Sequence, residues 1–192
     1  MTQSPDILSS SADEHGILRL TLNDAARRNA LSNAMLDRLG TAIQSADTDT
    51  SIRCIILSAN GPAFCAGHDL KEIAAARDAD DRGRAFFQQV MQSCSSVMQA
   101  IVTCSKPIIA EIDGIATAAG CQLVASCDLA LASDTSSFST PGVHIGLFCS
   151  TPMVALSRNV SNKHAMEMLL TGDMIPAHRA CEFGLINRTV PA

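Results

Sequence analysis

The stretch that decides the fold is Phe64-Cys65-Ala66-Gly67-His68-Asp69-Leu70-Lys71-Glu72. It follows residues 54–57, a short continuous apolar run that is typical of a buried strand. The chain then turns on small residues and enters a polar stretch that favours a helix. Backbone N–H groups at such a strand exit are free to point at a ligand.

A second stretch, residues 113–122, repeats this arrangement. An apolar strand ends at Asp113-Gly114, small residues follow, and a helix begins, whose N-terminus favours negative charge. Two N–H groups, one from each stretch, would form an oxyanion hole if they met at one carbonyl oxygen, and one such donor is worth about 10²–10³ in rate. Close packing also explains turns made of small residues, so the spacing alone leaves both interpretations open.

Apolar periodicity outlines the elements around these two stretches. Residues 1–15 are polar and serine-rich, and we expect a flexible N-terminus followed by one core domain over residues 16–192. Strands that alternate with helices predict an α/β domain. The expected strands are residues 17–22, 54–57, 108–112 and 129–132, and the expected helices are about 33–46, 83–103, 119–126, 151–158, 163–170 and 177–183.

Size and charge exclude several classes of protein. The chain has 192 residues, 47% of them hydrophobic, which suits one domain with a sizeable core. No apolar run reaches the ~20 residues of a membrane helix, and residues 1–15 show no signal or transit peptide, so we expect no membrane partner. The net charge of -5 argues against nucleic acid as a partner. A small polyanion is still compatible with basic residues that gather locally.

The eight cysteines form no C-x-x-C pair and no zinc-binding spacing with histidine. We therefore expect no metal site and reduced thiols that pack as small core residues. Reduced cysteines also predict a cytoplasmic location.

Several motifs in order resemble the crotonase (enoyl-CoA hydratase/isomerase) superfamily. Residues 64–72 resemble its F-x-A-G-x-D-[LI]-K-E signature, and residues 106–128 resemble its K-P-x-I-A…N-G-x-A-x-G-G-G-x-E-L…C-D signature. Residues 28–31 resemble the N-A-L entry motif, and residues 170–191 resemble the C-terminal L-T-G…G-L-[VI]…V-P pattern. Residues 121–128 and 140–152 are most similar to the enoyl-CoA hydratase domain-containing proteins.

The resemblance implies a ClpP/crotonase-like spiral of β-β-α repeats that binds a coenzyme A thioester, with no permanently bound cofactor. It implies that the backbone N–H groups of His68 and Ala119 are the oxyanion donors. Family members continue into C-terminal helices that are missing or very short here, and with them the resemblance implies a homotrimer or hexamer. The positions that match the coenzyme A-binding region, with Ala66 against the adenine and basic side chains near the phosphates, are Arg28, Ala30, Ala66, Asp69, Leu70 and Lys71.

Two departures from the family pattern affect catalysis. Family hydratases hold a water between two glutamates, and those positions are Gln122 and Gly142 here. A glutamine amide cannot accept a proton near neutral pH, and glycine has no side chain. General acid–base help is worth about 10²–10⁴ per group, so we expect weak or absent hydratase activity with thioester binding retained.

Three other residues are possible substitutes for the missing carboxylates. His144 lies close to Gly142, and histidine is a common general base, but such a histidine is more often a satisfied structural group. Glu111 interrupts an apolar strand, and outward solvation or a salt bridge is the expected outcome. Cys149 has no sequence environment that would activate its thiol.

We therefore expect an acyl-CoA- or enoyl-CoA-binding protein of the enoyl-CoA hydratase/isomerase type. The alternative is a non-catalytic acyl-CoA-binding or regulatory subunit of fatty acid metabolism. A dinucleotide-binding oxidoreductase is disfavoured, because residues 114–120 lack the G-x-G-x-x-G spacing.

Overall fold

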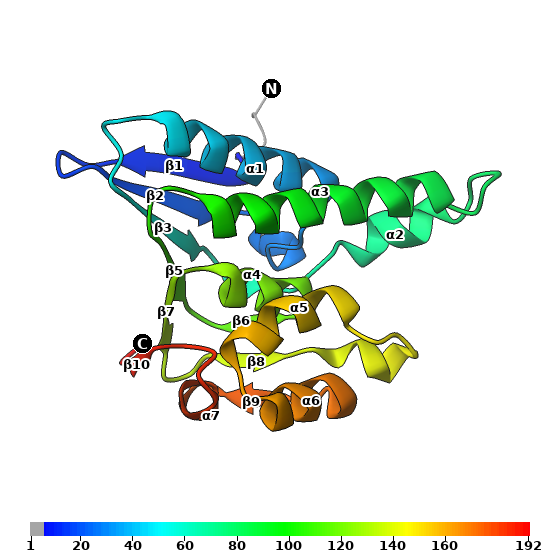
Figure 1. The fold of residues 1–192 in the computed structure, drawn as a ribbon. Coiled ribbons are helices and arrows are strands. Elements are labelled where there is room, and N and C mark those ends of the chain that lie inside the picture. Colours follow the sequence, from blue (N-terminus) through cyan, green and yellow to red (C-terminus); the bar gives the residue numbers. More distant parts are fainter. Residues whose placement is uncertain (1–5) are drawn as a thin grey trace.

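Three successive units, each made of two strands and a helical segment, wind through this computed structural model, which describes residues 6–192 (Figure 1). In each unit the first strand joins a six-stranded sheet and the second strand joins a four-stranded sheet. The strand pairs are β3 (Cys54–Ala59) with β4 (Ala63–Cys65), β5 (Ile108–Ile112) with β6 (Ile115–Thr117), and β7 (Leu129–Ser133) with β8 (Ser137–Ser139). This confirms the predicted α/β spiral of β-β-α repeats.

The remaining strands extend both sheets at their edges. The six-stranded sheet has the order β1-β2-β3-β5-β7-β10 and is parallel except for β1, while the other has the order β4-β6-β8-β9 and is parallel except for β9. These remaining strands are β1 (Leu8–Ala12), β2 (Ile17–Leu22), β9 (Ile175–Pro176) and β10 (Arg188–Val190).

All six predicted helices are confirmed. Ser32 caps α1, because its hydroxyl oxygen accepts a hydrogen bond from the Met35 N–H at 3.2 Å. The helical elements are η1 (Ala25–Arg27), α1 (Asn33–Thr48), α2 (Leu70–Ala76), α3 (Arg84–Thr103), α4 (Ala119–Ser126), η2 (Pro141–Ile145), α5 (Ser150–Asn159), α6 (Asn162–Thr171) and α7 (Ala177–Phe183).

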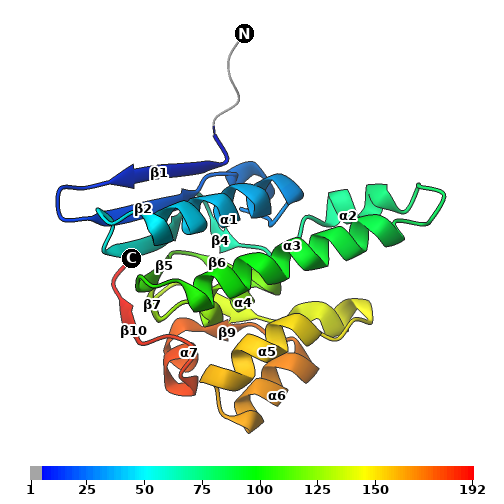
Figure 2. The same ribbon diagram turned by 45° about the horizontal axis from the view of Figure 1, so that its top comes forward.

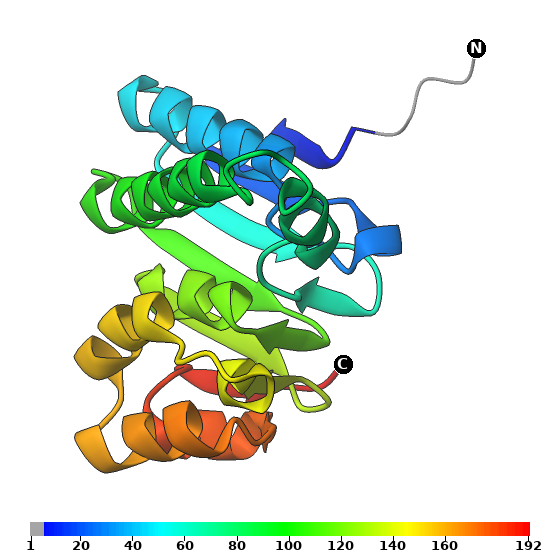
Figure 3. The same cartoon turned by 90° about the vertical axis from the view of Figure 1, so that its right-hand side faces the viewer.

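Helices α1 and α3 lie side by side on the same face of the six-stranded sheet (Figures 2 and 3). Their apolar stripes are buried, with Leu39 and Ile43 from α1 and Val97 and Ile101 from α3. Full burial of such a side chain contributes about 1.5–3 kcal/mol. The cysteines are free, and Cys65, Cys94, Cys121 and Cys149 are buried in this core, which confirms their use as small core residues.

The N-terminal segment differs from the prediction of a flexible stretch over residues 1–15. Leu8–Ala12 pairs with β2 as an antiparallel edge strand, anchored by the buried Leu8. The turn between them is closed by Asp13, whose carboxylate accepts hydrogen bonds from the backbone N–H groups of His15 and Ile17 at 2.9 Å. Residues 1–5 lie outside the described residues. Across residues 6–192, no helix has the length and apolar character that spanning a membrane requires.

Candidate functional site

The two stretches singled out in the sequence meet in the structure. Gly67 has a φ of +88°, and a Cβ built on it would lie 3.0 Å from the Ala118 Cβ and 3.2 Å from the Ala119 backbone nitrogen. The Thr117 hydroxyl donates to the Ala66 carbonyl oxygen at 3.1 Å and links the two loops. His68, which carries the first predicted donor, therefore directly follows a residue whose α-carbon lies near the Ala119 nitrogen, the second predicted donor.

Neither predicted donor N–H is used within the fold. Ala119 is the first residue of α4, so its N–H has no acceptor inside the helix. Among residues 6–192, no carbonyl or side chain accepts a hydrogen bond from the N–H of His68 or Ala119. Ala118, which precedes α4, has φ 51° and ψ -119°, and its own N–H donates to the Ser139 carbonyl oxygen at 2.9 Å. A non-glycine residue held there is strained by about 1–3 kcal/mol.

The segment from Arg28 to Leu31 runs along the first loop. The Ala66 N–H donates to the Arg28 carbonyl oxygen at 3.1 Å, and the Leu31 N–H donates to the Gly67 carbonyl oxygen at 2.8 Å. Ala30 between them is buried. The predicted coenzyme A-binding positions 28, 30 and 66 are thus brought together.

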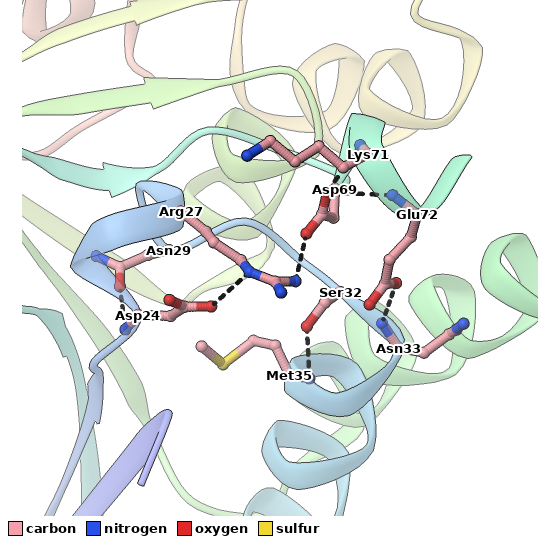
Figure 4. A network of polar contacts seen from close by, with 9 residues as sticks. All are labelled: Asp24, Arg27, Asn29, Ser32, Asn33, Met35, Asp69, Lys71 and Glu72. Atoms are coloured by element: carbon pink, nitrogen blue, oxygen red, sulfur yellow. Dashed lines mark hydrogen bonds and ion pairs between the residues drawn. The ribbon is translucent and has the colours of Figure 1, made fainter. Parts of the chain in front are cut away.

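Asp69, which the resemblance placed among the coenzyme A-binding positions, has a structural role in the fold (Figure 4). It caps α2, because its carboxylate accepts hydrogen bonds from the N–H groups of Lys71 at 2.8 Å and Glu72 at 3.3 Å. Its second oxygen accepts from Arg27 at 2.9 Å, and the carboxyl group is buried. Burial alone would raise the pKa of Asp69, but these hydrogen bonds and the Arg27 charge outweigh it and hold the pKa below its usual value.

Arg27 is a residue that sequence reasoning missed. It stands next to Arg28, and nothing in the local sequence shows which of the two pairs with the Asp69 carboxylate. Arg27 also lies 3.9 Å from the Asp24 carboxylate. Glu72, on the first turn of α2, accepts a hydrogen bond from the Asn33 N–H at 3.0 Å and so ties α2 to α1 (Figure 4).

Arg28 and Lys71 are the free cations of this region. Both are exposed, and among the described residues neither has a carboxylate within 4.0 Å. The Lys71 side chain points away from Glu72 (Figure 4). The neighbouring Leu70 is 65% exposed, which makes it an apolar side chain beside a cation at the surface.

The two positions of the family glutamates have contrasting surroundings. Gln122 lies on the first turn of α4, is buried, and has no hydrogen-bond partner for its Oε1 within the described part of the chain. It faces a cleft of about 600 Å³ between α3, α4 and α5. Gly142 is crowded, because a Cβ there would lie 2.5 Å from the Leu147 carbonyl oxygen and 2.8 Å from the Cys149 Sγ.

His144 and Glu111, two side chains considered as substitutes for the carboxylates, are engaged elsewhere. His144 is exposed, and its Nε2 lies 2.8 Å from the Thr171 carbonyl oxygen. Glu111 is exposed and forms a two-pronged ion pair with Arg19, at 2.7 and 3.1 Å, as expected for an outward residue. Burial lowers the pKa of His68, whose imidazole is therefore neutral near pH 7. In residues 6–192 no group of three His, Cys, Asp or Glu side chains is placed to hold a metal ion.

The comparison with known proteins agrees with the fold and the loop motifs. Residues 12–192 match the family described as Enoyl-CoA hydratase/isomerase. The chain is 50% identical over 190 residues to mouse enoyl-CoA hydratase domain-containing protein 3, mitochondrial, covering 99% of this chain and 62% of that protein. It is 35% identical over 181 residues to 2,3-dehydroadipyl-CoA hydratase of Escherichia coli, covering 92% of this chain and 66% of that protein.

Solved structures show the same architecture. An enoyl-CoA hydratase of Mycobacterium smegmatis superimposes with a TM-score of 0.91 at 48% identity, over 97% of this chain and 70% of that one. Human enoyl coenzyme A hydratase domain-containing protein 3 gives 0.89 at 47% identity, over 97% and 71%. The vertebrate relatives are named as mitochondrial proteins, so they do not support the predicted cytoplasmic location. The chain, which spans less than two thirds of the mouse relative, belongs to the enoyl-CoA hydratase/isomerase family of the crotonase superfamily.

Proposed function

We propose that this chain binds an acyl- or enoyl-CoA and holds the thioester carbonyl oxygen between the backbone N–H groups of His68 and Ala119. The observation that carries the proposal is the contact of two loops that each present an unused N–H at this point. The positive end of α4 adds to the attraction for developing negative charge on that oxygen. Two such donors stabilise an enolate without needing a titrating side chain.

The coenzyme A moiety lies along Arg28, Ala30, Ala66, Leu70 and Lys71 in this proposal. The free cations Arg28 and Lys71 pair with phosphate oxygens. The Ala66 N–H donates to the Arg28 carbonyl oxygen. The Ala66 carbonyl oxygen already accepts from the Thr117 hydroxyl, and its second lone pair is the one that accepts from the adenine amino group in this proposal. Asp69 takes no part in ligand binding and instead fixes the turn that follows His68.

The chemistry at the α and β carbons is restricted. Adding water to an enoyl thioester needs proton transfer at both carbons, and neither Gln122 nor Gly142 can accept a proton. We therefore propose weak or absent hydratase turnover, with binding and enolate stabilisation retained. The site retains the groups needed for reactions that depend mainly on stabilising an enolate.

A second candidate function is a non-catalytic acyl-CoA-binding or regulatory subunit of fatty acid metabolism. The packing at Gly142 favours it, because the Leu147 carbonyl and the Cys149 thiol occupy the space that a side chain at this position would need. Assembly into a trimer or hexamer and a cytoplasmic location belong to the proposal as well, and light scattering together with localisation of the tagged chain tests them.

The decisive measurement compares binding with turnover in the full chain. Calorimetric titration with crotonyl-CoA and with free coenzyme A should show tighter binding of the thioester, while crotonyl-CoA hydration stays far below that of an ordinary hydratase. Equal affinity for both ligands would contradict the oxyanion assignment, and rapid hydration would contradict the loss of turnover. Gln122→Glu is the informative variant, because Gly142→Glu would require the loop to shift.

A further inference from the structure

Ala118 holds a backbone conformation that residues other than glycine rarely adopt. Its φ of 51° and ψ of -119° match the first central position of a type II′ turn, where glycine prevails. Among residues 6–192, Ala118 is one of four residues other than glycine with a positive φ. Rotation about the ψ angle of Ala118 turns the peptide plane that carries the Ala119 N–H. The direction of the second donor of the proposed site therefore depends on a strained residue.

Backbone hydrogen bonds fix Ala118 on both of its sides. Its N–H donates to the Ser139 carbonyl oxygen of β8 at 2.9 Å, and its carbonyl oxygen accepts from the Gln122 N–H of α4 at 3.1 Å. A residue in a strained conformation persists only when its surroundings over-determine that conformation. These two bonds supply part of the restraint, and both come from backbone groups that no substitution removes.

Thr117, directly before Ala118, adds a restraint from a side chain. The backbone pairing of β4 with β6 ends at Cys65 and Ala116. One residue further along each strand, the half-buried Thr117 donates from its hydroxyl to the Ala66 carbonyl oxygen at 3.1 Å. This bond joins the two loops at the point where the backbone ladder has ended, and a substitution can remove it.

We propose that Thr117 is a positioning residue, which holds the strained Ala118 so that the Ala119 N–H stays aimed at the thioester carbonyl oxygen. Without the hydroxyl, the strain at Ala118 relaxes by a rotation that moves the Ala119 N–H off that oxygen. The other donor, His68, lies two residues after Ala66, so the same hydrogen bond ties the loops of both donors together. The inference deepens the proposed function and rests on it.

The test measures how many times more tightly the full chain binds crotonyl-CoA than free coenzyme A, by calorimetric titration. Both ligands carry the same nucleotide, so an effect of a variant on adenine binding at the Ala66 carbonyl cancels in this preference. Thr117→Val keeps the shape of the side chain and removes the donor, and it should lower the preference about 3- to 10-fold, the value of one neutral hydrogen bond. Thr117→Ser retains a hydroxyl and should keep the preference of the unaltered chain.

Relief of the strain separates positioning from a merely structural role. Glycine adopts the conformation of Ala118 without a Cβ penalty, so Thr117→Val/Ala118→Gly should recover the preference to within about 2-fold of the unaltered chain. Ala118→Gly alone should keep it. Thr21→Val is the matched control, because it also removes the hydroxyl of a half-buried strand threonine, one that lies 2.9 Å from the Ser58 hydroxyl, and it should leave the preference unchanged.

The outcomes distinguish the inference from the proposed function. If the unaltered chain prefers the thioester and Thr117→Val retains that preference, the inference is overturned while the oxyanion site stands. A double variant no better than Thr117→Val, or a loss of preference in Thr117→Ser, overturns it as well. If the unaltered chain does not prefer the thioester, the proposed oxyanion site itself fails. Thr117→Ala, which also lacks the hydroxyl, takes the place of the valine variant if that variant does not fold.

Discussion

Gly67 is the residue on which the approach of the two loops depends. Its φ of +88° lies in the region that favours glycine, and its α-carbon faces the Ala119 nitrogen closely enough that an added Cβ would lie 3.2 Å from it. We expect Gly67→Ala to lose the extra affinity for thioesters over free coenzyme A, because the methyl group crowds the second donor. The backbone strain should also lower the free energy of unfolding by about 1–2 kcal/mol. Calorimetric titration and urea unfolding measure the two effects.

Gly146→Ala provides the matched control for backbone strain. Gly146 has a φ of +73°, but a Cβ there would meet nothing within 4 Å. This variant should therefore lose about 1 kcal/mol of stability and keep the thioester preference. If both alanine variants bind thioesters as the unaltered chain does, the contact at Gly67 does not control the donor site.

At the scale of elements, the N-terminus of the short helix α2 is capped by the Asp69 carboxylate. Asp69 accepts from two N–H groups of α2 and from Arg27, and these contacts keep its pKa below the usual value. Because the pKa of Asp69 is lower in the folded chain, its ionised carboxylate stabilises the fold. This stabilisation is complete above about pH 3.9, the pKa of an aspartate in an unfolded chain. It is lost as the pH falls through the pKa of Asp69 in the folded chain. Asp69→Asn should lower the free energy of unfolding by about 1 kcal/mol at pH 7. The difference from the unaltered chain should stay constant down to about pH 5 and shrink below pH 4.

The neighbouring arginines supply the control for this cap. Arg27→Gln removes the ion pair with Asp69 and should raise the pKa of that carboxyl group toward its usual range. Arg28→Gln removes an arginine of the same segment that has no carboxylate partner among the described residues, and it should leave the acid unfolding curve unchanged. Equal effects of the two substitutions would show that general charge, and not the pair, sets the stability of α2.

Sequence patterns predicted the helices and strands that are long enough to show a periodic spacing of apolar residues. All six expected helices and the four longer inner strands appear, because their apolar faces pack on one core. The strands β4, β6 and β8 have three residues each, too few for an alternating pattern to be recognised. They form because each pairs with a strand from another turn of the spiral, and that information is not local.

The features of the candidate site also fall into two groups, those that sequence motifs predicted and those that they did not. The motifs around Gly67 and Ala119 identified the two loops, and their contact follows from the family resemblance. The pairing of Asp69 with Arg27, the crowding at Gly142 and the missing partner of Gln122 depend on packing between distant segments. No residue pattern in one stretch of the chain carries these facts, so they emerge only from the folded chain.

For the whole molecule, a net charge of -5 opposes the binding of a polyanion such as coenzyme A. The local attraction of Arg28 and Lys71 must outweigh this repulsion at the proposed site. Salt screens both the attraction and the repulsion, since the Debye length falls from about 10 Å at 0.1 M to about 3 Å at 1 M. We expect added salt to weaken coenzyme A binding to the unaltered chain, because the nearby attraction is stronger than the distant repulsion.

The double variant Arg28→Gln/Lys71→Gln should reverse this dependence. With the two local cations removed, only the long-range repulsion is left, so added salt should leave the weakened binding unchanged or improve it. Lys163→Gln/Arg188→Gln, on α6 and β10, removes the same total charge and should keep the original salt dependence. Calorimetric titration at several salt concentrations measures the slopes. If the two double variants have the same slope, net charge alone governs affinity, and Arg28 and Lys71 do not form a phosphate site.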